Sequence, residues 1–331
     1  MNLSPKSATA VSSRQAIEIL RPCSKIAIIT HYRPDGDAIG SMLALAASLQ
    51  EWGKEVVCIN RDPVPAYLDF LQTEQTFVCA PDTADLNGVE LVVALDCATI
   101  ERLGDSAVSL LPDVPVITID HHITNEEYGD HLILDATSAA TGEILYQIIS
   151  ENHLPLPTLS RDALYVAIST DTGSLQYSNA TARTYSIMAQ LVDAGVDVAH
   201  INSQTYFNHS VRKVELLREC LQSFSLSHDG QVSHWTISQA AQSEIGAQPG
   251  DMEGLMDILR GISGVRVCFT LEESSSGAVR LSMRSKDDLV DVSKICGHFG
   301  GGGHRMAAGA AINLPLEDCL QQVLAVTEKA L

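Results

Sequence analysis

Short apolar runs alternate with helical stretches along the first half of the chain. The four apolar runs lie at residues 25–30, 55–60, 91–95 and 114–119. Between the first two, a helix is predicted from Ala38 to Trp52, and Gly53 stands where a glycine commonly ends a helix. Runs without polar alternation are typical of parallel strands covered on both faces. The pattern therefore predicts an α/β fold whose mainly parallel sheet is flanked by helices.

The second half of the chain has a different pattern. Residues 138–223 are mostly helical in periodicity, and a strand–helix–strand pattern returns after residue 224. The amphipathic, charged stretch before that point predicts helices rather than strands. We therefore predict a first α/β domain at 15–195, a helical connector at 196–224, and a smaller C-terminal α/β domain at 225–331.

Polar residues directly follow three of the predicted strands. His31 follows the first apolar run, Asp96 the third, and Asp120, His121 and His122 the fourth. Each of these positions alone is typical of a helix cap or an ordinary loop. An open α/β sheet, however, binds its ligands at the carboxyl ends of its strands. We therefore expect these side chains to meet at one edge of the sheet.

Two further segments add carboxylates. The loop HYRPDGDAIGS holds Asp35 and Asp37, and the segment STDTGS holds Asp171. A lone Asp-Gly-Asp is more often a simple turn, so its meaning depends on the other positions. Mixed imidazole and carboxylate ligands suit Mn²⁺ better than an all-oxygen Mg²⁺ site. Two histidines and four aspartates from four segments are enough for two ions that share one carboxylate.

A run of glycines marks the C-terminal part, in the segment GHFGGGGHRMAAG at 297–309. Consecutive glycines expose backbone N–H groups and permit close approach of a ligand, and His304 and Arg305 add donors. The run predicts a phosphate cradle at the start of a helix. The simpler alternative is a flexible turn, which the small residues at 307–309 make less attractive because they indicate tight packing.

Composition narrows the classes of function. Acidic residues number 41 and Lys plus Arg 21, which gives a formal net charge of −20. A hydrophobic fraction of 45% excludes a disordered chain. The acid excess argues against a protein that grips long nucleic acid through a basic surface. It supplies metal ligands or simply solubility.

The sequence also bears on location. The longest uncharged stretch, residues 38–49, is too short to span a bilayer, and the N-terminal residues lack the apolar core of a signal peptide. None of the eight cysteines forms a C-x-x-C pair, and several lie in apolar runs. We expect a cytoplasmic protein without membrane contact, whose cysteines are small core residues in a reducing compartment.

Taken together and in order, the motifs resemble those of a known family. HYRPDGDAIGS, LDCA, IDHH and STDTGS resemble the four N-terminal motifs of the DHH phosphoesterases, and GGGHRMAAG resembles the signature of the DHH-associated C-terminal domain. The resemblance spans residues 15–330. Within the family the chain is most similar to members that degrade short oligoribonucleotides and dephosphorylate 3′-phosphoadenosine-5′-phosphate (pAp). It departs at Leu175, where family members commonly carry Phe; we expect this to affect packing and not metal binding.

The resemblance implies a role for each matching position. Asp96 would bridge two metal ions, His122 would face the scissile phosphate, and Asp120 would orient a histidine. The remaining ligands would be His31 and Asp35 at one ion, and Asp37, His121 and Asp171 at the other. The far end of the substrate would be held by Gly301, Gly302, Gly303 and His304, with help from Arg284. Arg33 and Arg183 stand beside the motifs, where they contact either substrate or only solvent.

The resemblance further implies an activity and its partners. Two divalent ions, Mn²⁺ first with Mg²⁺ or Co²⁺ as alternatives, would activate water. The substrates would be short single-stranded RNA of a few nucleotides, cut to nucleoside monophosphates, and pAp, converted to AMP. Long nucleic acid is not expected as a partner, and a homodimer is a reasonable assembly. Two alternatives remain: a phosphodiesterase for linear or cyclic dinucleotide messengers, and a nucleotide-binding protein without catalysis.

Overall fold

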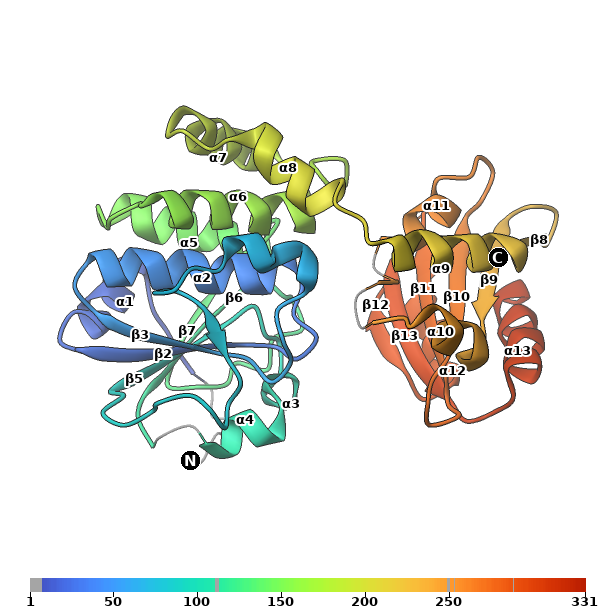
Figure 1. Cartoon of the computed structure of the whole chain (residues 1–331), viewed down its shortest axis with the longest axis horizontal. Helices are drawn as coiled ribbons and strands as arrows, with labels where there is room; N and C mark the ends of the chain where they lie inside the picture. Colours follow the sequence, from blue (N-terminus) through green and yellow to red (C-terminus); the bar gives the residue numbers. More distant parts are fainter. Residues whose placement is uncertain (1–7, 111–112, 249–250, 253, 288) are drawn as a thin grey trace. The chain divides into compact units, whose positions relative to one another are not determined.

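A computed structural model describes residues 8–110, 113–248, 251–252, 254–287 and 289–331. The chain divides into two compact units, Met1–Asn208 and His209–Leu331 (Figure 1). Each unit has its own sheet and its own apolar core. The predicted α/β class, with a larger parallel-sheet unit followed by a smaller one, is confirmed.

Unit one contains a parallel sheet with the strand order β1-β7-β6-β5-β2-β3-β4. The strands are β1 (Thr9–Ala10), β2 (Lys25–Thr30), β3 (Glu55–Ile59), β4 (Val78–Cys79), β5 (Leu91–Leu95), β6 (Val116–Asp120) and β7 (His131–Leu134). The four predicted strands are β2, β3, β5 and β6, which lie next to one another. The shorter strands at the edges were not predicted, because two to four residues carry little periodic signal.

The helices of unit one lie on both faces of its sheet, and some of them pack mainly on other helices (Figure 1). They are α1 (Ser13–Leu20), α2 (Gly36–Glu51), the 3₁₀ helix η1 (Ala66–Leu71), α3 (Ile100–Leu103), α4 (Asp105–Leu110), α5 (Thr141–Glu151), α6 (Thr158–Asp171), α7 (Ala182–Asp193) and α8 (Val198–Tyr206). Ile26 and Ile28 of β2 face the core shared with α2, α5 and α6. The intervening Ala27 and Ile29 face the core that includes Leu103 of α3. Strands buried on both faces explain the uninterrupted apolar runs.

Helix α2 lies between the sheet and α6, and every residue from Gly36 to Leu49 is buried. The two helices approach closely because α2 presents glycines to α6. A Cβ atom on Gly40 would lie 2.6 Å from the carbonyl oxygen of Ala163, and one on Gly36 would overlap the side chain of Thr170. The N-terminus of α2 is therefore held against the C-terminus of α6.

Unit two is built on a six-stranded sheet with the order β12-β13-β11-β10-β9-β8, in which only the β9–β10 pair is parallel among the described pairs. Its strands are β8 (Ser225–Ser227), β9 (Val232–Ile237), β10 (Val267–Glu273), β11 (Val279–Ser285), β12 (Gly302–His304) and β13 (Ala307–Ile312). Its helices are α9 (Val211–Gln222), α10 (Gln239–Ile245), α11 (Met256–Arg260), α12 (Val292–His298) and α13 (Leu316–Glu328). Two apolar clusters, on the two sheet faces, form its core.

The predicted connector, residues 196–224, is divided between the two units. Helix α8 buries Ile201 in the core of unit one. Helix α9 buries Leu216 and Cys220 against Trp235 in unit two. Each helix has an apolar face of its own, so each packs onto the unit beside it in the sequence.

Most of the cysteines are small core residues, as the sequence predicts. All eight cysteines have free thiols, and six of them are buried. Within the described ranges, no helix is both long enough and apolar enough to cross a bilayer.

Candidate metal centre

The ends of three adjacent strands deliver the predicted residues to one edge of the unit-one sheet. In the order β6-β5-β2, these strands run into His121 and His122, Asp96, and His31. The strands are parallel, so their carboxyl ends lie at the same edge. Helices α2 and α6 bring further carboxylates to this edge from their facing ends.

The first ligand group consists of His31, Asp35 and Asp96, whose ligand atoms lie within 4.8 Å of one another. His31 Nε2 is 3.8 Å from Asp35 Oδ2 and 3.6 Å from Asp96 Oδ2. His31 Nδ1 is 2.9 Å from the carbonyl oxygen of Tyr32, which can only accept a hydrogen bond. Nδ1 also lies 3.1 Å from Arg102 Nη2, and Nε2 is the ring nitrogen that faces the two carboxylates.

The second ligand group consists of Asp37, His121 and Asp171, again within 4.8 Å. His121 Nε2 is 3.8 Å from Asp37 Oδ2 and 3.5 Å from Asp171 Oδ2. Its Nδ1 is 3.2 Å from the carbonyl oxygen of Ser138, so its Nε2 is the ring nitrogen that faces the cluster. The two imidazoles are oriented in the same way by different carbonyl groups.

Asp96 belongs to both sets of contacts. Its Oδ2 faces His31, and its Oδ1 lies 3.5 Å from His121 Nε2. The hydroxyl of Thr141 donates a hydrogen bond to Oδ1 at 3.0 Å. Asp96 also has a φ of +53°, in the left-handed region that residues other than glycine rarely adopt. Such strain is typical of residues whose position the surrounding structure determines.

The carboxylates of the cluster repel one another. Burial, together with the charges of Asp96, Asp171 and Asp35, raises the pKa of Asp37 well above its ordinary value. Burial and the charges of Asp35 and Asp96 likewise raise the pKa of Asp171. Burial opposes the ionisation of Asp96 too, but its three histidine neighbours outweigh burial and hold its pKa below the ordinary value. Divalent cations would relieve this repulsion, and the His and Asp donors fit such ions.

His122 pairs with Asp120 and also forms a third possible ligand group with Asp96 and His121. His122 Nδ1 lies 2.7 Å from Asp120 Oδ1, and 3.7 Å from Asp96 Oδ1. The other oxygen of Asp120 accepts a hydrogen bond of 2.6 Å from the Asn125 amide. Burial alone would lower the pKa of His122, but the Asp120 hydrogen bond and the two carboxylate charges outweigh it and raise the pKa to about 9. The raised pKa favours the protonated ring in the metal-free protein, and Asp120 contacts its Nδ1.

The raised pKa of His122 makes the stability of the metal-free protein depend on pH. A histidine whose folded pKa exceeds its ordinary value near 6.5 stabilises the fold fully below that value, and loses this effect as the pH rises through the folded pKa. We expect the contribution of His122 to the free energy of unfolding to fall by about 3 kcal/mol between about pH 6.5 and about pH 9. Denaturant unfolding of the wild type and of His122→Asn, both in EDTA, measures this contribution. The stability difference between them should shrink over this window, and a constant difference would contradict the assignment.

Sequence reasoning missed several contributors. The backbone N–H groups of Thr141 and Gly142, at the start of α5, donate to Asp37 at 2.6 and 3.0 Å. The available signal was the run SAATGE, whose Ser, Thr and Gly residues precede a helix. Arg102, in the last turn of α3, places Nη2 3.1 Å from His31 Nδ1. It brings a cation to an edge that otherwise collects carboxylates.

The glycine run of unit two adopts a different structure from the predicted one. Gly302–His304 is strand β12, which pairs with β13, and the preceding helix α12 ends at His298. The expectation that the run begins a helix is therefore wrong. Glycine's freedom of φ and ψ had concealed the strand, since Gly303 has a φ of +140°. A Cβ on Gly303 would lie 2.6 Å from the carbonyl oxygen of Ala307.

The register of this sheet nevertheless brings the predicted residues to one face. His304 lies opposite Ala307, and Ala307 lies opposite Arg284. Directly opposed residues of antiparallel strands share a face, so Arg284 and His304 flank a small alanine. The next row is Gly302, Gly309 and Ser282. The result is a platform with little side-chain volume between a guanidinium and an imidazole.

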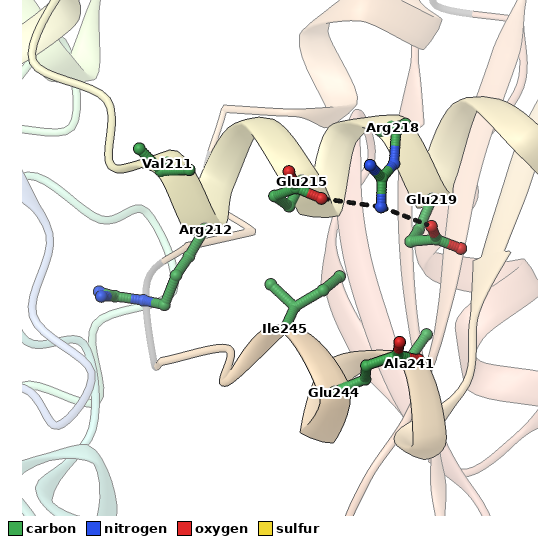
Figure 2. A pocket seen from close by; sticks show the side chains of 8 residues that line it. All are labelled: Val211, Arg212, Glu215, Arg218, Glu219, Ala241, Glu244 and Ile245. Carbon is green, nitrogen blue, oxygen red and sulfur yellow. Dashed lines mark hydrogen bonds and ion pairs between the residues drawn. The ribbon is translucent and has the colours of Figure 1, made fainter.

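A pocket of about 380 Å³ lies elsewhere in unit two, between α9 and α10 (Figure 2). Arg218 Nη2 there pairs with Glu215 at 2.8 Å and with Glu219 at 3.5 Å. These charges compensate one another across one turn of α9. The pocket contains none of the predicted site residues.

Two models of known protein families match the chain, one within each unit. The model of the DHH family, N-terminal domain, matches residues 25–168, and the model of the DHHA1 domain matches residues 236–331. The chain is 29% identical over 320 residues to the bifunctional oligoribonuclease and PAP phosphatase NrnA of Thermus thermophilus, covering 96% of this chain and 94% of that relative. It is 28% identical over 305 residues to the NrnA of Bacillus subtilis, covering 89% and 92%.

A solved structure has the same fold. The crystal structure of an exopolyphosphatase-related protein from Bacteroides fragilis superposes with a TM-score of 0.87 at 23% identity, covering 96% of this chain and 95% of that one. The two domain models together span more than half of the chain, in the order that the motifs predicted. The chain therefore belongs to the DHH family and carries a DHHA1 domain at its C-terminal end.

Proposed function

We propose that this chain is a metal-dependent phosphoesterase that cleaves short oligoribonucleotides to nucleoside monophosphates and converts pAp to AMP. The observation that carries the proposal is the position of Asp96, whose two carboxylate oxygens each face a histidine of a different ligand group. A carboxylate placed in this way suits two neighbouring ions. The NrnA relatives, which match nearly the whole chain, support the choice of substrates.

The two ligand groups would each hold one divalent ion, with Asp96 shared. Mn²⁺ is the ion that we propose, because it accepts both imidazole nitrogen and carboxylate oxygen. When bound, such ions supply a nucleophile from water and offset the charge of the phosphoryl oxygens. The carbonyl groups of Tyr32 and Ser138 keep the two histidine Nε2 atoms available for this purpose.

His122 contributes a proton rather than a lone pair. Its Nδ1 is engaged by Asp120, whose hydrogen bond and charge raise the pKa of the ring against the effect of burial. A charged imidazole can donate a hydrogen bond to a phosphoryl oxygen or a proton to the leaving ribose oxygen. Asp120 stabilises the charged form and fixes the orientation of the ring, and it is not proposed as a ligand.

Unit two would bind the part of the substrate that does not react. Arg284 and His304 provide donors for a phosphate, and the glycines of β12 let a nucleotide lie close to the backbone. The proposed preference is for short substrates, because the NrnA relatives are named as oligoribonucleases. The net charge of −20 also disfavours long polyanions.

Gly302 offers a direct test of the platform. A Cβ at this position would meet nothing within 4 Å, so Gly302→Ala should change the unfolding free energy by less than about 0.5 kcal/mol. The methyl group would protrude where a substrate is proposed to lie, and we expect KM for a diribonucleotide to rise about tenfold, roughly 1.4 kcal/mol. Turnover of bis-p-nitrophenyl phosphate, which needs only the metal centre, should not change.

Two other glycines serve as controls for this variant. Gly297 in α12 is equally open to a Cβ, and Gly297→Ala should leave KM unchanged. A Cβ on Gly301 would overlap the carbonyl oxygen of Gly309, so Gly301→Ala should lower the melting temperature. Unchanged KM in Gly302→Ala would remove the platform from the proposal.

The proposed function is tested by Mn²⁺-dependent hydrolysis of a length series, from a 5′-phosphorylated diribonucleotide to a 24-mer, with pAp and linear pApA alongside. We expect rapid release of mononucleotides from the shortest oligomers, cleavage of pAp, and loss of both activities in EDTA. Equal rates on the diribonucleotide and the 24-mer would contradict the preference for short substrates. Activity confined to pApA would instead indicate a phosphodiesterase for dinucleotide messengers. Bound metal without any turnover would indicate a nucleotide-binding protein.

A further inference from the structure

One short segment of backbone supports the second ligand group. Residues 138–142, called the 138–142 segment below, precede and begin α5. The segment donates two backbone N–H groups to Asp37 and accepts the Nδ1 proton of His121 at the carbonyl of Ser138. Asp37 and His121 are therefore held by main-chain groups, whose position depends on the path of the segment rather than on its side chains.

Arg183, from α7, fastens this segment with three different nitrogens. Its Nη1 lies 3.0 Å from Asp135 Oδ2, its Nη2 donates to Ser138 Oγ at 2.9 Å, and its Nε lies 3.2 Å from Glu143 Oε2. The arginine that the sequence left open as a substrate contact or a surface residue is engaged in the support of the site. The planar fork of a guanidinium makes three such contacts at once, and a lysine ammonium cannot.

Glu143 and Asn179 complete the support. Glu143 is fully buried, and its Oε2 also accepts the N–H of Ala139 at 3.2 Å. A buried carboxylate requires a cationic partner, which Arg183 provides. The Asn179 amide donates to the carbonyl of Ala139 at 3.2 Å and to that of Asp171 at 3.0 Å. The segment is thereby connected to all three residues of the second ligand group.

We propose that Arg183, paired with the buried Glu143, is a positioning residue that sets the geometry of the second ligand group. Arg183 touches none of the ligand side chains in its described contacts and acts through the 138–142 segment. The inference rests on the proposed metal-dependent function, because it concerns how tightly one of two ions is held.

The first ligand group depends on other contacts. In the described part of the chain, the hydrogen bonds of His31 lead to Tyr32 and Arg102, and Asp35 accepts from Ala38. Asp96 alone connects the first group to the segment, through the Thr141 hydroxyl. Loosening the 138–142 segment should therefore weaken the binding of the ion at the second ligand group and leave the binding of the other ion unchanged. A purely structural role of Arg183 would lower stability without distinguishing the two ions.

The test is Mn²⁺ titration of the full chain by calorimetry, with wild type, Arg183→Lys and Asp171→Ala compared. Arg183→Lys keeps the charge opposite Glu143 but loses the three-way fork. Partners of metal ligands are typically worth 10–100-fold in affinity, so we expect one Mn²⁺ site weakened by about that factor and the other unchanged. Asp171→Ala, which removes a ligand of the second group, identifies the weakened site.

The matched control is Arg161→Lys. Arg161, in α6 of the same unit, donates to the carbonyl of Ala194 at 2.6 Å and to Thr158 Oγ1 at 2.9 Å. Arg161→Lys loses hydrogen bonds much as Arg183→Lys does, but the bonds of Arg161 do not reach the 138–142 segment. Both Mn²⁺ affinities should therefore stay at wild-type values. Two unchanged sites in Arg183→Lys, or equal weakening of both, would overturn the inference. Should Arg183→Lys fold poorly, Asp135→Asn removes one partner of the fork more gently.

A second measurement does not require bound metal. In metal-free protein labelled with ¹⁵N-histidine, the Nδ1 signal of His121 reports its contact with the carbonyl of Ser138. We expect Arg183→Lys to shift this signal and leave the Nδ1 signal of His31 unchanged. A His121 signal identical to the wild type would contradict the positioning role. If the wild type binds no Mn²⁺ but the His121 signal still shifts, the proposed metal-dependent function fails and the positioning of His121 stands.

Discussion

Replacement of Asp96 by Ala is expected to abolish phosphoester hydrolysis and to weaken both Mn²⁺ sites. The side chain is buried, and its oxygens lie 3.6 Å from His31 Nε2 and 3.5 Å from His121 Nε2. Mutation of a residue that merely supports a metal ligand typically lowers metal affinity or activity by about 10–100-fold. Loss of the proposed shared ligand should therefore lower kcat/KM by more than about 100-fold. Activity on a diribonucleotide and Mn²⁺ titration measure the two effects.

Asp35→Ala provides the graded comparison. Asp35 is a partly exposed helix cap that belongs to the first ligand group alone. We expect this variant to lose affinity at one Mn²⁺ site and keep the other, whereas Asp96→Ala affects both. Full Mn²⁺ occupancy and retained turnover in Asp96→Ala would refute the bridging role. Circular dichroism of each variant separates these outcomes from a failure to fold.

Replacement of His122 by Ala should lower kcat by about 10²–10⁴-fold, the usual worth of a positioned proton donor, while Mn²⁺ binding is retained. His122 Nδ1 is committed to Asp120, and the pKa of His122 is raised to about 9. The prediction follows from the proposal that the ring acts as a donor and not as a ligand. Single-turnover rates at saturating Mn²⁺ report the loss directly.

Asp120→Asn is the companion variant, because an amide in place of the carboxylate removes the charge that favours protonated His122. We expect an intermediate loss of kcat, together with an activity that declines at lower pH than in the wild type. Loss of Mn²⁺ from His122→Ala would show instead that this histidine is a ligand, and the division between ligands and proton donor would need revision.

The residues that sequence could place are those whose side chains follow a strand. His31, Asp96 and His121 could be assigned to one sheet edge because parallel strands end on the same side, and this holds whatever the rest of the chain does. The same reasoning could not find the 138–142 segment. Its contribution to Asp37 is made by backbone N–H groups, which every residue except proline possesses.

Two further features depend on contacts between distant parts of the chain. Arg183 reaches the 138–142 segment from α7, and no spacing rule connects these positions. The close approach of Gly36 to Thr170 is equally invisible in sequence, because a glycine does not indicate which distant side chain it contacts. The glycine run of β12 misled the prediction, since glycine permits strand and loop conformations alike.

The spread of the ligands along the chain links the metal centre to folding. The positions run from His31 to Asp171 and include residues after β2, β5 and β6 as well as the facing ends of α2 and α6. No short stretch of unfolded chain contains a complete ligand group, so the ions should bind the native state far more tightly than the denatured one. Each ion at one hundred times its dissociation constant would then add about 2.7 kcal/mol to the stability. Thermal unfolding thus becomes a substrate-independent measure of ion affinity, and chelation a means of shortening the lifetime of the native protein.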